Sequence, residues 1–299
     1  MIVSKDCQLE LPSGIAIDFG GTKISASKIL KGEIIKNIQI STEKDLNVDD
    51  HIARISKLIE NLKISDSDKI GVAVTGRIDE SGDWYSVNDT TLVKIQSAPL
   101  QKKLSEKFKR NVRVMNDAIA AASGEYIAGS GKGFSSIGYI TISTGVGGGF
   151  ILRGVPLTSK QGLANHIGFT TSRIATDFCG SGRVKTIESI ASGRAMAKLA
   201  EEKGYTNFDA KKIYAEYLLG KDWAKQIIML SAEAIAELCA NIQSTLDPEI
   251  IILGGSIGLA DGYLTLVEKF LQNEPEIFRS KLKPSSLGVN ASKIGVLKD

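Results

Sequence analysis

Three segments of this sequence run from an apolar stretch directly into a glycine-rich turn. They read DFGGTK from Asp18 to Lys23, STGVGGG from Ser143 to Gly149, and LGGS from Leu253 to Ser256. Such a turn lets backbone N–H groups approach anionic oxygens without interference from a Cβ atom. Taken singly, each is better explained as a plain hairpin or strand-end turn. Three of them in one chain, with Asp18 leading the first and Thr144 in the second, favour a fold that binds a nucleotide.

Two common nucleotide motifs are not the explanation. A P-loop needs a glycine directly before its lysine and hydroxyl residue, whereas GSGRVKT has Val184 before Lys185 and Thr186. The stretch GVGGGF does not complete a dinucleotide fingerprint, because Phe150 stands where the last glycine would be and the pattern predicts a strand after it. The glycine turns therefore belong to a different type of phosphate site.

The first third of the chain predicts strands followed by a helix. Residues 14–41 alternate apolar and polar residues in three runs, the pattern of consecutive antiparallel strands. Apolar residues then recur at helical spacing over 48–63, and two more strands are expected within 69–79 and 112–117. Hairpin strands followed by helix-linked strands indicate an α/β domain with a mixed sheet.

The second half repeats this arrangement in altered form. A strand, a glycine turn and another strand are expected from GYITIS through TGVGGG to FILRG, and a long helix over 224–246 ends before Pro248. We expect two related α/β lobes, each presenting a hairpin turn to one cleft. The predicted lobes are residues 1–116 and 117–286, with residues 287–299 packing back on the first.

Composition narrows the class of protein. The formal net charge of +3 is spread over 299 residues, which gives no electrostatic footprint for nucleic acid. The N-terminus has no apolar run of signal-peptide length and no window approaches a membrane span, so we expect neither secretion nor a membrane partner. Cys7, Cys179 and Cys239 are odd in number and far apart, which suggests reduced thiols in a cytoplasm.

The ordered set of motifs resembles a known superfamily. The stretch DFGGTK, the pair Asn116 and Asp117, then STGVGGG and LGGS occur in the order found in sugar kinases, hsp70 and actin. More narrowly, the chain resembles the ROK family of sugar kinases and repressors from about Gly14 to Ala291. The resemblance implies a two-lobed, ribonuclease H-like fold with its active site between the lobes, ATP and Mg²⁺ as cofactors, and a homodimer.

The resemblance also implies roles for two carboxylates. Asp117 would be the general base that takes the proton from a sugar 6-hydroxyl. Considered alone, Asp117 is equally well explained as the cap of the helix that follows it. Asp18 would hold the water shell of Mg²⁺, and its alternative is a structural aspartate at a turn.

Two further groups of residues take roles from the resemblance. The nucleotide would be bound by Gly20, Gly21, Thr22, Lys23, Thr144, Gly145, Gly147, Gly148, Gly254 and Gly255. The sugar would be bound by Gly76, Arg77, Asn88, Asn116, His166 and Glu188. Two of these have plain alternatives, since a lone histidine beside Ile167 is often a core residue and Arg77 could be a surface residue after its strand.

Within the family, GLANHIGF, IESIASGRA and GGSIGLADGYLTLVE are similar to bacterial N-acetylmannosamine kinases of sialic acid breakdown. Most ROK kinases have glutamate at the position of His166, and histidine there favours this subgroup. The same chemistry on N-acetylglucosamine or glucose remains an alternative. A repressor is disfavoured because only thirteen residues precede the first predicted strand. A sugar-binding protein without turnover is disfavoured by the presence of both Asp18 and Asp117.

The zinc knuckle that ROK proteins commonly carry is not complete here. Its four ligand positions correspond to Phe169, Cys179, Ser181 and Thr186, and zinc needs about four nitrogen, sulfur or oxygen donors. We therefore expect no structural zinc. The hypothesis is that this loop holds Glu188 against the sugar through apolar packing of Phe169, Phe178 and Ile187 in place of a metal.

Overall fold

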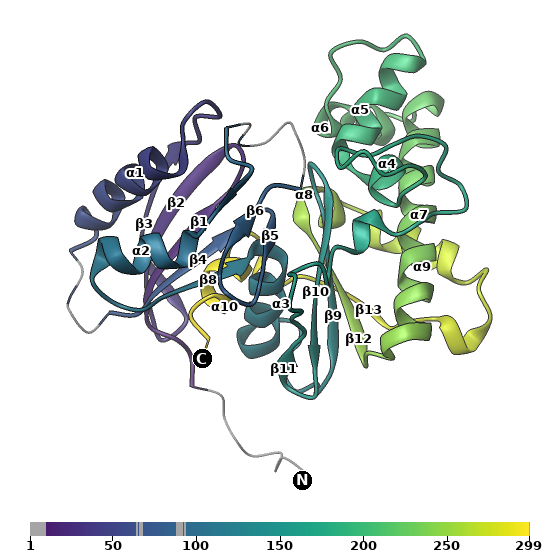
Figure 1. Cartoon of the computed structure of the whole chain (residues 1–299). Helices are drawn as coiled ribbons and strands as arrows, with labels where there is room; N and C mark the ends of the chain where they lie inside the picture. The colour runs from purple at the N-terminus through teal and green to yellow at the C-terminus, as the bar shows by residue number, and fades with distance from the viewer. Residues whose placement is uncertain (1–9, 64, 66–67, 88–91, 93, 299) are drawn as a thin grey trace.

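The computed structural model describes residues 10–63, 65, 68–87, 92 and 94–298 of the chain. Two five-stranded sheets lie side by side with helices between and outside them (Figure 1). The first sheet has the strand order β3 (Glu33–Ser41), β2 (Lys23–Leu30), β1 (Gly14–Phe19), β4 (Ile70–Val74), β8 (Val112–Asn116). The second has the order β11 (Val155–Pro156), β10 (Val146–Leu152), β9 (Ile137–Ile142), β12 (Ile250–Gly254), β13 (Leu282–Pro284).

The two sheets share one pairing scheme. In the first, β1 pairs antiparallel with β2 and parallel with β4; in the second, β9 pairs antiparallel with β10 and parallel with β12. The expected antiparallel strands in residues 14–41, and the mixed character of the sheet, are therefore confirmed. A small third sheet joins β5 (Arg77–Ile78), β6 (Trp84–Tyr85) and β7 (Ser97–Ala98), so the strand expected over 69–79 is wrong beyond Val74, where the chain turns at Gly76.

Helices cover both faces of the first sheet. Helix α1 (Val48–Glu60) and helix α2 (Leu100–Phe108) pack on one face through Ile52, Ile55 and Leu104, which are all buried. Helix α1 begins at a capping box, in which Asn47 accepts from two backbone N–H groups and the Asp50 side chain accepts from the Asn47 N–H. The amphipathic pattern over 48–63 thus forms the predicted helix.

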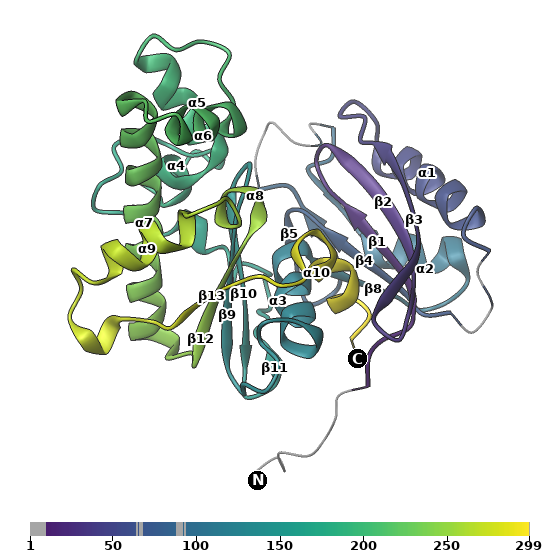
Figure 2. The ribbon, with the colours of Figure 1, turned by 180° about the vertical axis from the view of Figure 1, so that it is seen from behind.

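Helix α3 (Asp117–Ala128) lies between the two sheets. Its Ile119 and Ala120 belong to the core under the first sheet, whereas Ala121 and Ala122 belong to a core with strands of the second. The C-terminal helix α10 (Ala291–Gly295) packs against α3 and against β1 and β4, which the view from behind shows (Figure 2). Helix α3 therefore contacts the sheets of both lobes, and its first residue is Asp117.

The outer face of the second sheet carries the remaining helices. These are α4 (Glu188–Ala191), α5 (Gly193–Glu202), α6 (Ala210–Leu218), α7 (Asp222–Leu246), α8 (Gly255–Gly258) and α9 (Tyr263–Leu271). Short 3₁₀ turns occur at Ile167–Phe169, Glu276–Phe278 and Gly288–Asn290. By length and composition α7 alone, among the described residues, could cross a membrane, but 61% of its apolar window is buried inside the protein, as in a core helix.

The run Gly147 to Gly149 is not a turn. These glycines lie inside strand β10, and the chain reverses earlier, at Ser143 to Gly145, where the Ser143 N–H donates to the Gly145 carbonyl. A Cβ atom on Gly149 would lie 2.5 Å from the Ala118 carbonyl oxygen of α3. Gly149 lies in the strand because the helix packs directly on it, and a Cβ on Gly148 would meet Ile167 at 2.4 Å, which the glycine run alone does not reveal.

Candidate functional site

A cavity of about 500 Å³ opens between the two lobes. Both predicted hairpin turns line it, residues 20–22 after β1 and residues 143–145 after β9, as the sequence predicted for one shared cleft. Most of the predicted site residues lie on its wall: Gly20, Gly21, Thr22, Gly76, Asn116, Asp117, Thr144, Gly145, Gly147, Gly148, His166 and Glu188. Segments far apart in the sequence thus converge on one space.

Asp117 lies at the N-terminus of α3, directly after the buried strand β8. Asn116 caps the helix, because its side-chain oxygen accepts from the N–H groups of Ala118 and Ile119 at 3.0 and 3.2 Å. The Asn116 amide nitrogen also donates to the Gly76 carbonyl at 2.8 Å, which links the turn after β4 to the start of α3. Asn116 therefore caps the helix, and the Asp117 carboxylate accepts from the same Ala118 N–H at 2.9 Å.

The environment of Asp117 disfavours its negative charge. Burial and, to a smaller extent, the nearby carboxylate of Asp18 raise the pKa of Asp117, hydrogen bonds from the backbone and from Asn116 oppose the rise, and the resulting pKa is about 7. Burial also raises the pKa of Asp18, against the attraction of Lys293 and Lys23. The carboxylate of Asp117 on the cavity wall and that of Asp18 beside the first turn therefore repel each other, an arrangement that a divalent cation would relieve.

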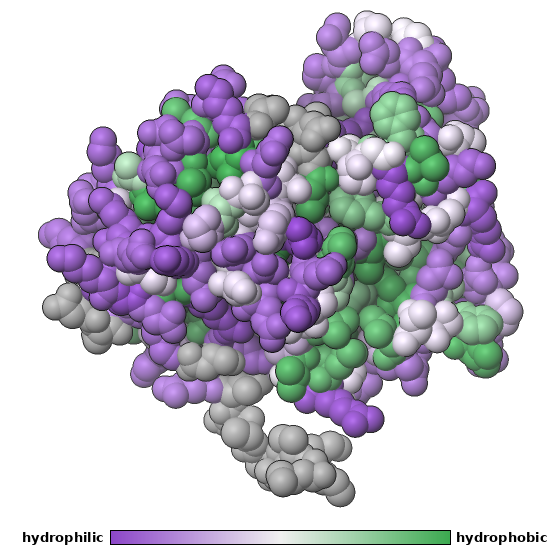
Figure 3. All heavy atoms as spheres, in the orientation of Figure 1, coloured by the Kyte–Doolittle hydropathy of each residue, from purple (hydrophilic) through white to green (hydrophobic). Residues whose placement is uncertain are grey.

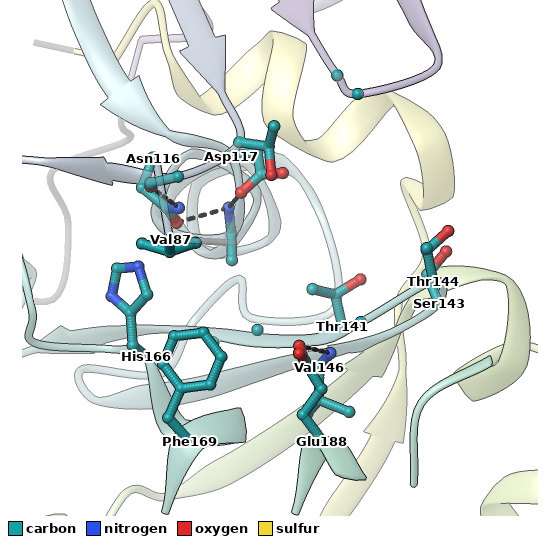
Figure 4. Close-up of a pocket in the computed structure, with 18 of the residues that line it drawn as sticks. Val87, Asn116, Asp117, Thr141, Ser143, Thr144, Val146, His166, Phe169 and Glu188 are labelled. Carbon is teal, nitrogen blue, oxygen red and sulfur yellow. Dashed lines mark hydrogen bonds between the residues drawn. The ribbon is translucent and has the colours of Figure 1, made fainter. Parts of the chain in front are cut away.

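The opposite wall carries the polar groups that the resemblance assigns to a sugar. Figure 4 shows the side chains of His166 and Glu188 pointing toward the wall that holds Asn116 and Asp117. Burial lowers the pKa of His166, which keeps the ring neutral near pH 7, and its Nδ1 has no hydrogen-bond partner in the part of the chain that the structure describes. The ring stacks on Phe169 with centroids 5.8 Å apart.

Several predicted residues do not line the cavity. The Arg77 guanidinium donates to the Gln161 carbonyl and lies 4.0 Å from the centre of the Tyr85 ring. Gly254 and Gly255 pack against β9, where a Cβ on Gly255 would lie 2.3 Å from the Ile142 carbonyl oxygen. Outside the cavity wall as well are Asp18 and Lys23, although both flank the first turn, and Asn88 lies outside the described residues.

The cavity is also lined by residues to which the sequence analysis gave no binding role. They are Lys44, Thr75, Val87, Ala118, Thr141, Ser143, Val146, Asn165, Phe169 and Arg194. Ser143 and Val146 belong to a motif that was recognised, but no pattern marks Lys44, which reaches the cavity from the segment after β3. Arg194 lies in the recognised stretch IESIASGRA without a role, because its side-chain direction depends on the fold of the loop before it.

The loop at the former knuckle positions has no metal-binding set. The Sγ of Cys179 lies 3.0 Å from the Ser181 hydroxyl, and within the described residues no three His, Cys, Asp or Glu side chains converge on a point. The donors present do not suit zinc, and its absence remains a prediction. The packing hypothesis is partly wrong: Ile187 is buried, but Phe178 is 61% exposed because its backbone pairs with Val184 and turns the ring outward.

Comparison with known proteins agrees with this geometry. The sequence profile of the ROK family matches residues 14–298. The chain belongs to the ROK family. Among curated relatives, an N-acetylmannosamine kinase of Haemophilus influenzae (strain PittEE) is 35% identical over 281 residues, 94% of this chain and 93% of the relative. An N-acetylmannosamine kinase of Escherichia coli (strain 55989 / EAEC) is 36% identical over 282 residues, 94% of this chain and 96% of the relative.

Solved structures place the fold in the same ROK group. The crystal structure of the ROK hexokinase from Thermus thermophilus superposes with a TM-score of 0.79 at 25% identity, over 95% of this chain and 96% of that one. The paired mixed sheets with α3 between them are therefore the two-lobed sugar kinase and actin-like fold that the motif order implied.

Proposed function

We propose that this ROK protein is an ATP-dependent kinase that phosphorylates the 6-hydroxyl of N-acetylmannosamine, giving N-acetylmannosamine 6-phosphate and ADP. The observation that carries the proposal is Asp117, a carboxylate whose pKa is raised to about 7 and which faces His166 and Glu188 across one cavity. Two hairpin turns with glycines border the same cavity. The proposed base, the proposed sugar-binding residues and the two turns thus border the same cavity.

Asp117 has the properties of a general base at neutral pH. A base works best when its pKa lies near the working pH, because it is then ionised and still accepts a proton readily. Burial and the neighbouring Asp18 supply that shift. In this mechanism Asp117 accepts the proton of the sugar hydroxyl as its oxygen attacks the terminal phosphorus of ATP, and ADP leaves from the opposite side.

The nucleotide would be bound by the two hairpin turns. Backbone N–H groups of glycine turns suit phosphate oxygens, and residues 20–22 and 143–145 border the cavity from the two lobes. The oxygen donors of Asp18 suit Mg²⁺, which is usually held by one or two carboxylates together with substrate phosphates and water. When bound, Mg²⁺ neutralises the charge of the phosphates. The residues of the former knuckle do not fit zinc, and no step depends on it.

The choice of sugar rests on the relatives and on His166. Relatives named N-acetylmannosamine kinase match 94% of the chain at 35% and 36% identity. His166 lines the cavity with a neutral imidazole, a ring that is suited to a hydrogen bond with a sugar hydroxyl or an acetamido group. The place of this reaction would be sialic acid and amino sugar breakdown.

Oligomeric state and location belong to the same proposal. The view in Figure 3 shows hydrophilic side chains over most of the first lobe and hydrophobic ones gathered around the strands of the second. That distribution suits association of two copies through the second lobe, and we propose a cytoplasmic homodimer. Sedimentation velocity on the purified chain measures the oligomeric state directly.

The test of the proposed function is ADP release with Mg-ATP, comparing N-acetylmannosamine, N-acetylglucosamine, glucose and no sugar. We expect the highest kcat/KM with N-acetylmannosamine. A higher value with another sugar would retain the kinase and remove the sugar assignment. No ADP above the sugar-free rate with any of them would contradict the kinase itself.

A further inference from the structure

Arg194 is a pocket residue to which the mechanism above gives no task. We infer that Arg194 is a positioning residue, which holds Glu188 in the orientation that meets the sugar and ties it to the loop of residues 170–187 and to the second hairpin turn. The inference rests on the proposed function, because it concerns the sugar side of that site. Three sets of contacts support it.

The first set fixes the carboxylate of Glu188 from two sides. Its Oε2 accepts from the Val146 N–H at 3.1 Å, and its Oε1 lies 3.5 Å from Nη2 of Arg194. Glu188 is only 7% exposed, so its orientation depends on these two contacts and not on solvent. Burial raises the pKa of Glu188, and the hydrogen bond from Val146 and the charge of Arg194 oppose that rise. Arg194 thus favours the ionised form as well as one rotamer.

The second set anchors the backbone of Arg194 to the turn after β9. The N–H of Gly193 donates to the Ser143 carbonyl at 2.8 Å, and the N–H of Arg194 donates to the Thr144 carbonyl at 3.3 Å. Ser192 caps α5 by accepting from the Ala195 N–H at 3.1 Å. The start of α5 is therefore bonded to the hairpin turn that we assign to the nucleotide. The Arg194 side chain extends from there to Glu188, on the side of the cavity that we assign to the sugar.

The third set links helix α5 to the loop of residues 170–187. A Cβ atom on Gly180 would lie 3.4 to 3.5 Å from the guanidinium of Arg194, so this glycine lies flat against the cation. One turn further along α5, Lys198 pairs with Asp177 and its Nζ lies 4.9 Å from the centre of the Phe178 ring. Residues four apart lie on one face of a helix, so two cations of α5 hold the tip of the loop.

These contacts hold the loop through protein groups. Backbone bonds close it at its base, where Ile187 donates to Thr170 at 2.9 Å and Ser172 donates to Lys185 at 2.9 Å. Arg194 contacts both the loop and Glu188, whereas the contacts of Lys198 described above are with the loop. This difference provides a matched pair of variants.

The test is a double-mutant cycle on sugar affinity. Arg194→Met, Glu188→Gln and the double variant are titrated with N-acetylmannosamine by calorimetry, and KM for ATP is measured in parallel. We expect Arg194→Met to weaken sugar binding about tenfold, the range for one hydrogen bond to a charged group, with KM for ATP changed less than twofold. In the Glu188→Gln background the same change adds less than twofold, because its effect passes through Glu188.

Lys198→Met is the matched control. Its ion pair with Asp177 is exposed, so sugar affinity should change less than twofold. Arg194→Lys keeps the charge and loses the planar fork, and it should show an intermediate loss; it also replaces Arg194→Met in the cycle if that variant fails to fold.

Three results would overturn the inference. The first is an additive cycle, in which Arg194→Met weakens binding equally with and without Glu188. The second is a rise in KM for ATP as large as the loss of sugar affinity, which would make Arg194 a nucleotide contact. The third is wild-type protein that binds neither N-acetylmannosamine, N-acetylglucosamine nor glucose. If a sugar binds without being phosphorylated, the kinase proposal fails alone and the cycle is run with that sugar.

Discussion

Each of the two sheets contains an antiparallel hairpin with a glycine-rich sequence, but the glycines lie at different places in the two hairpins. In each, a hairpin is extended by a parallel strand, β4 beside β1 in the first and β12 beside β9 in the second. The first hairpin has its glycines in the turn, at Gly20 and Gly21. The second has three glycines inside strand β10, where α3 packs directly on Gly149 and Gly148 faces Ile167 on the other side. Similar glycine-rich sequences thus border the cavity in both lobes, and in the second lobe they also allow close packing of a helix.

This contrast shows why the site forms where it does. Close packing of α3 on β10 draws the helix against the second lobe, while Ile119 and Ala120 belong to the core of the first. The N-terminus of α3, with Asp117, is therefore held between the two hairpin turns. Packing of α3 on Gly149 helps to position the carboxylate that we propose as the base, and the turn glycines border the space in front of it.

Asp117→Asn is expected to have the largest effect, because it removes the base and leaves both hairpins intact. Turnover should fall roughly 10²–10⁴-fold, the usual contribution of a positioned base, while sugar affinity changes little. Steady-state kcat and calorimetric titration with N-acetylmannosamine measure the two quantities on the same preparation. Near-normal turnover in this variant would mean that Asp117 is not the base.

Gly149→Ala tests the packing half of the comparison, with Gly147→Ala as its partner in the same strand. A Cβ on Gly149 meets the Ala118 carbonyl oxygen at 2.5 Å, whereas on Gly147 the nearest atom is the Thr141 methyl at 3.3 Å. We expect Gly149→Ala to lower the free energy of unfolding by about 2–3 kcal/mol and Gly147→Ala by less than about 1 kcal/mol. Urea denaturation measures both, and equal losses would contradict the packing argument.

The pH dependence tests the electrostatic position of Asp117 between the lobes. With a pKa of about 7, the carboxylate loses its ability to accept a proton as pH falls, so kcat/KM for the sugar should decrease about tenfold between pH 8 and pH 6. The residual activity of Asp117→Asn is the control, since it should lack this acid limb. A flat profile in the wild type down to pH 5 would contradict the raised pKa.

The same shift has a consequence for stability. Because burial raises the pKa of Asp117 in the folded state, its contribution to stability is present below about pH 4 and is lost as pH rises through about 7. Asp117→Asn should therefore unfold at a higher temperature than the wild type at pH 8, with a smaller difference at pH 4. Thermal unfolding followed by circular dichroism at both pH values compares them.

His166→Phe is expected to have the smallest effect, and it tests whether His166 contributes to sugar binding. Phenylalanine keeps a ring for packing on Phe169 but lacks the ring nitrogens that could bond to a sugar. Loss of one hydrogen bond should raise KM for N-acetylmannosamine about fivefold and leave KM for ATP unchanged. Unchanged KM for the sugar would indicate that His166 is only a core residue.

The sequence predicted the elements whose signal is local. The alternation over residues 14–41 and the helical spacing over 48–63 both reflect side chains that face a core. The placement of Asp117 beside two hairpin turns followed from the order of motifs. What could not be predicted depends on contacts between distant segments.

The misses share that physical cause. A run of three glycines predicts a turn unless the helix that packs on it is known, so Gly147 to Gly149 were expected in the wrong element. Phe178 was expected to be buried because it is apolar, but its ring is 61% exposed and its contact is the cation of Lys198 at the surface. The position of Arg194 in the cavity depends on how α5 begins, which no local pattern records.

The most direct test of the central claim is a competition for limiting Mg-ATP between equimolar N-acetylmannosamine and N-acetylglucosamine, with the products identified by phosphorus–proton NMR. The account predicts that the phosphoryl group appears mainly on the 6-oxygen of N-acetylmannosamine, and that Asp117→Asn gives almost none. Phosphorylation mainly of N-acetylglucosamine, transfer to another hydroxyl, or a product yield that does not depend on Asp117 would contradict it.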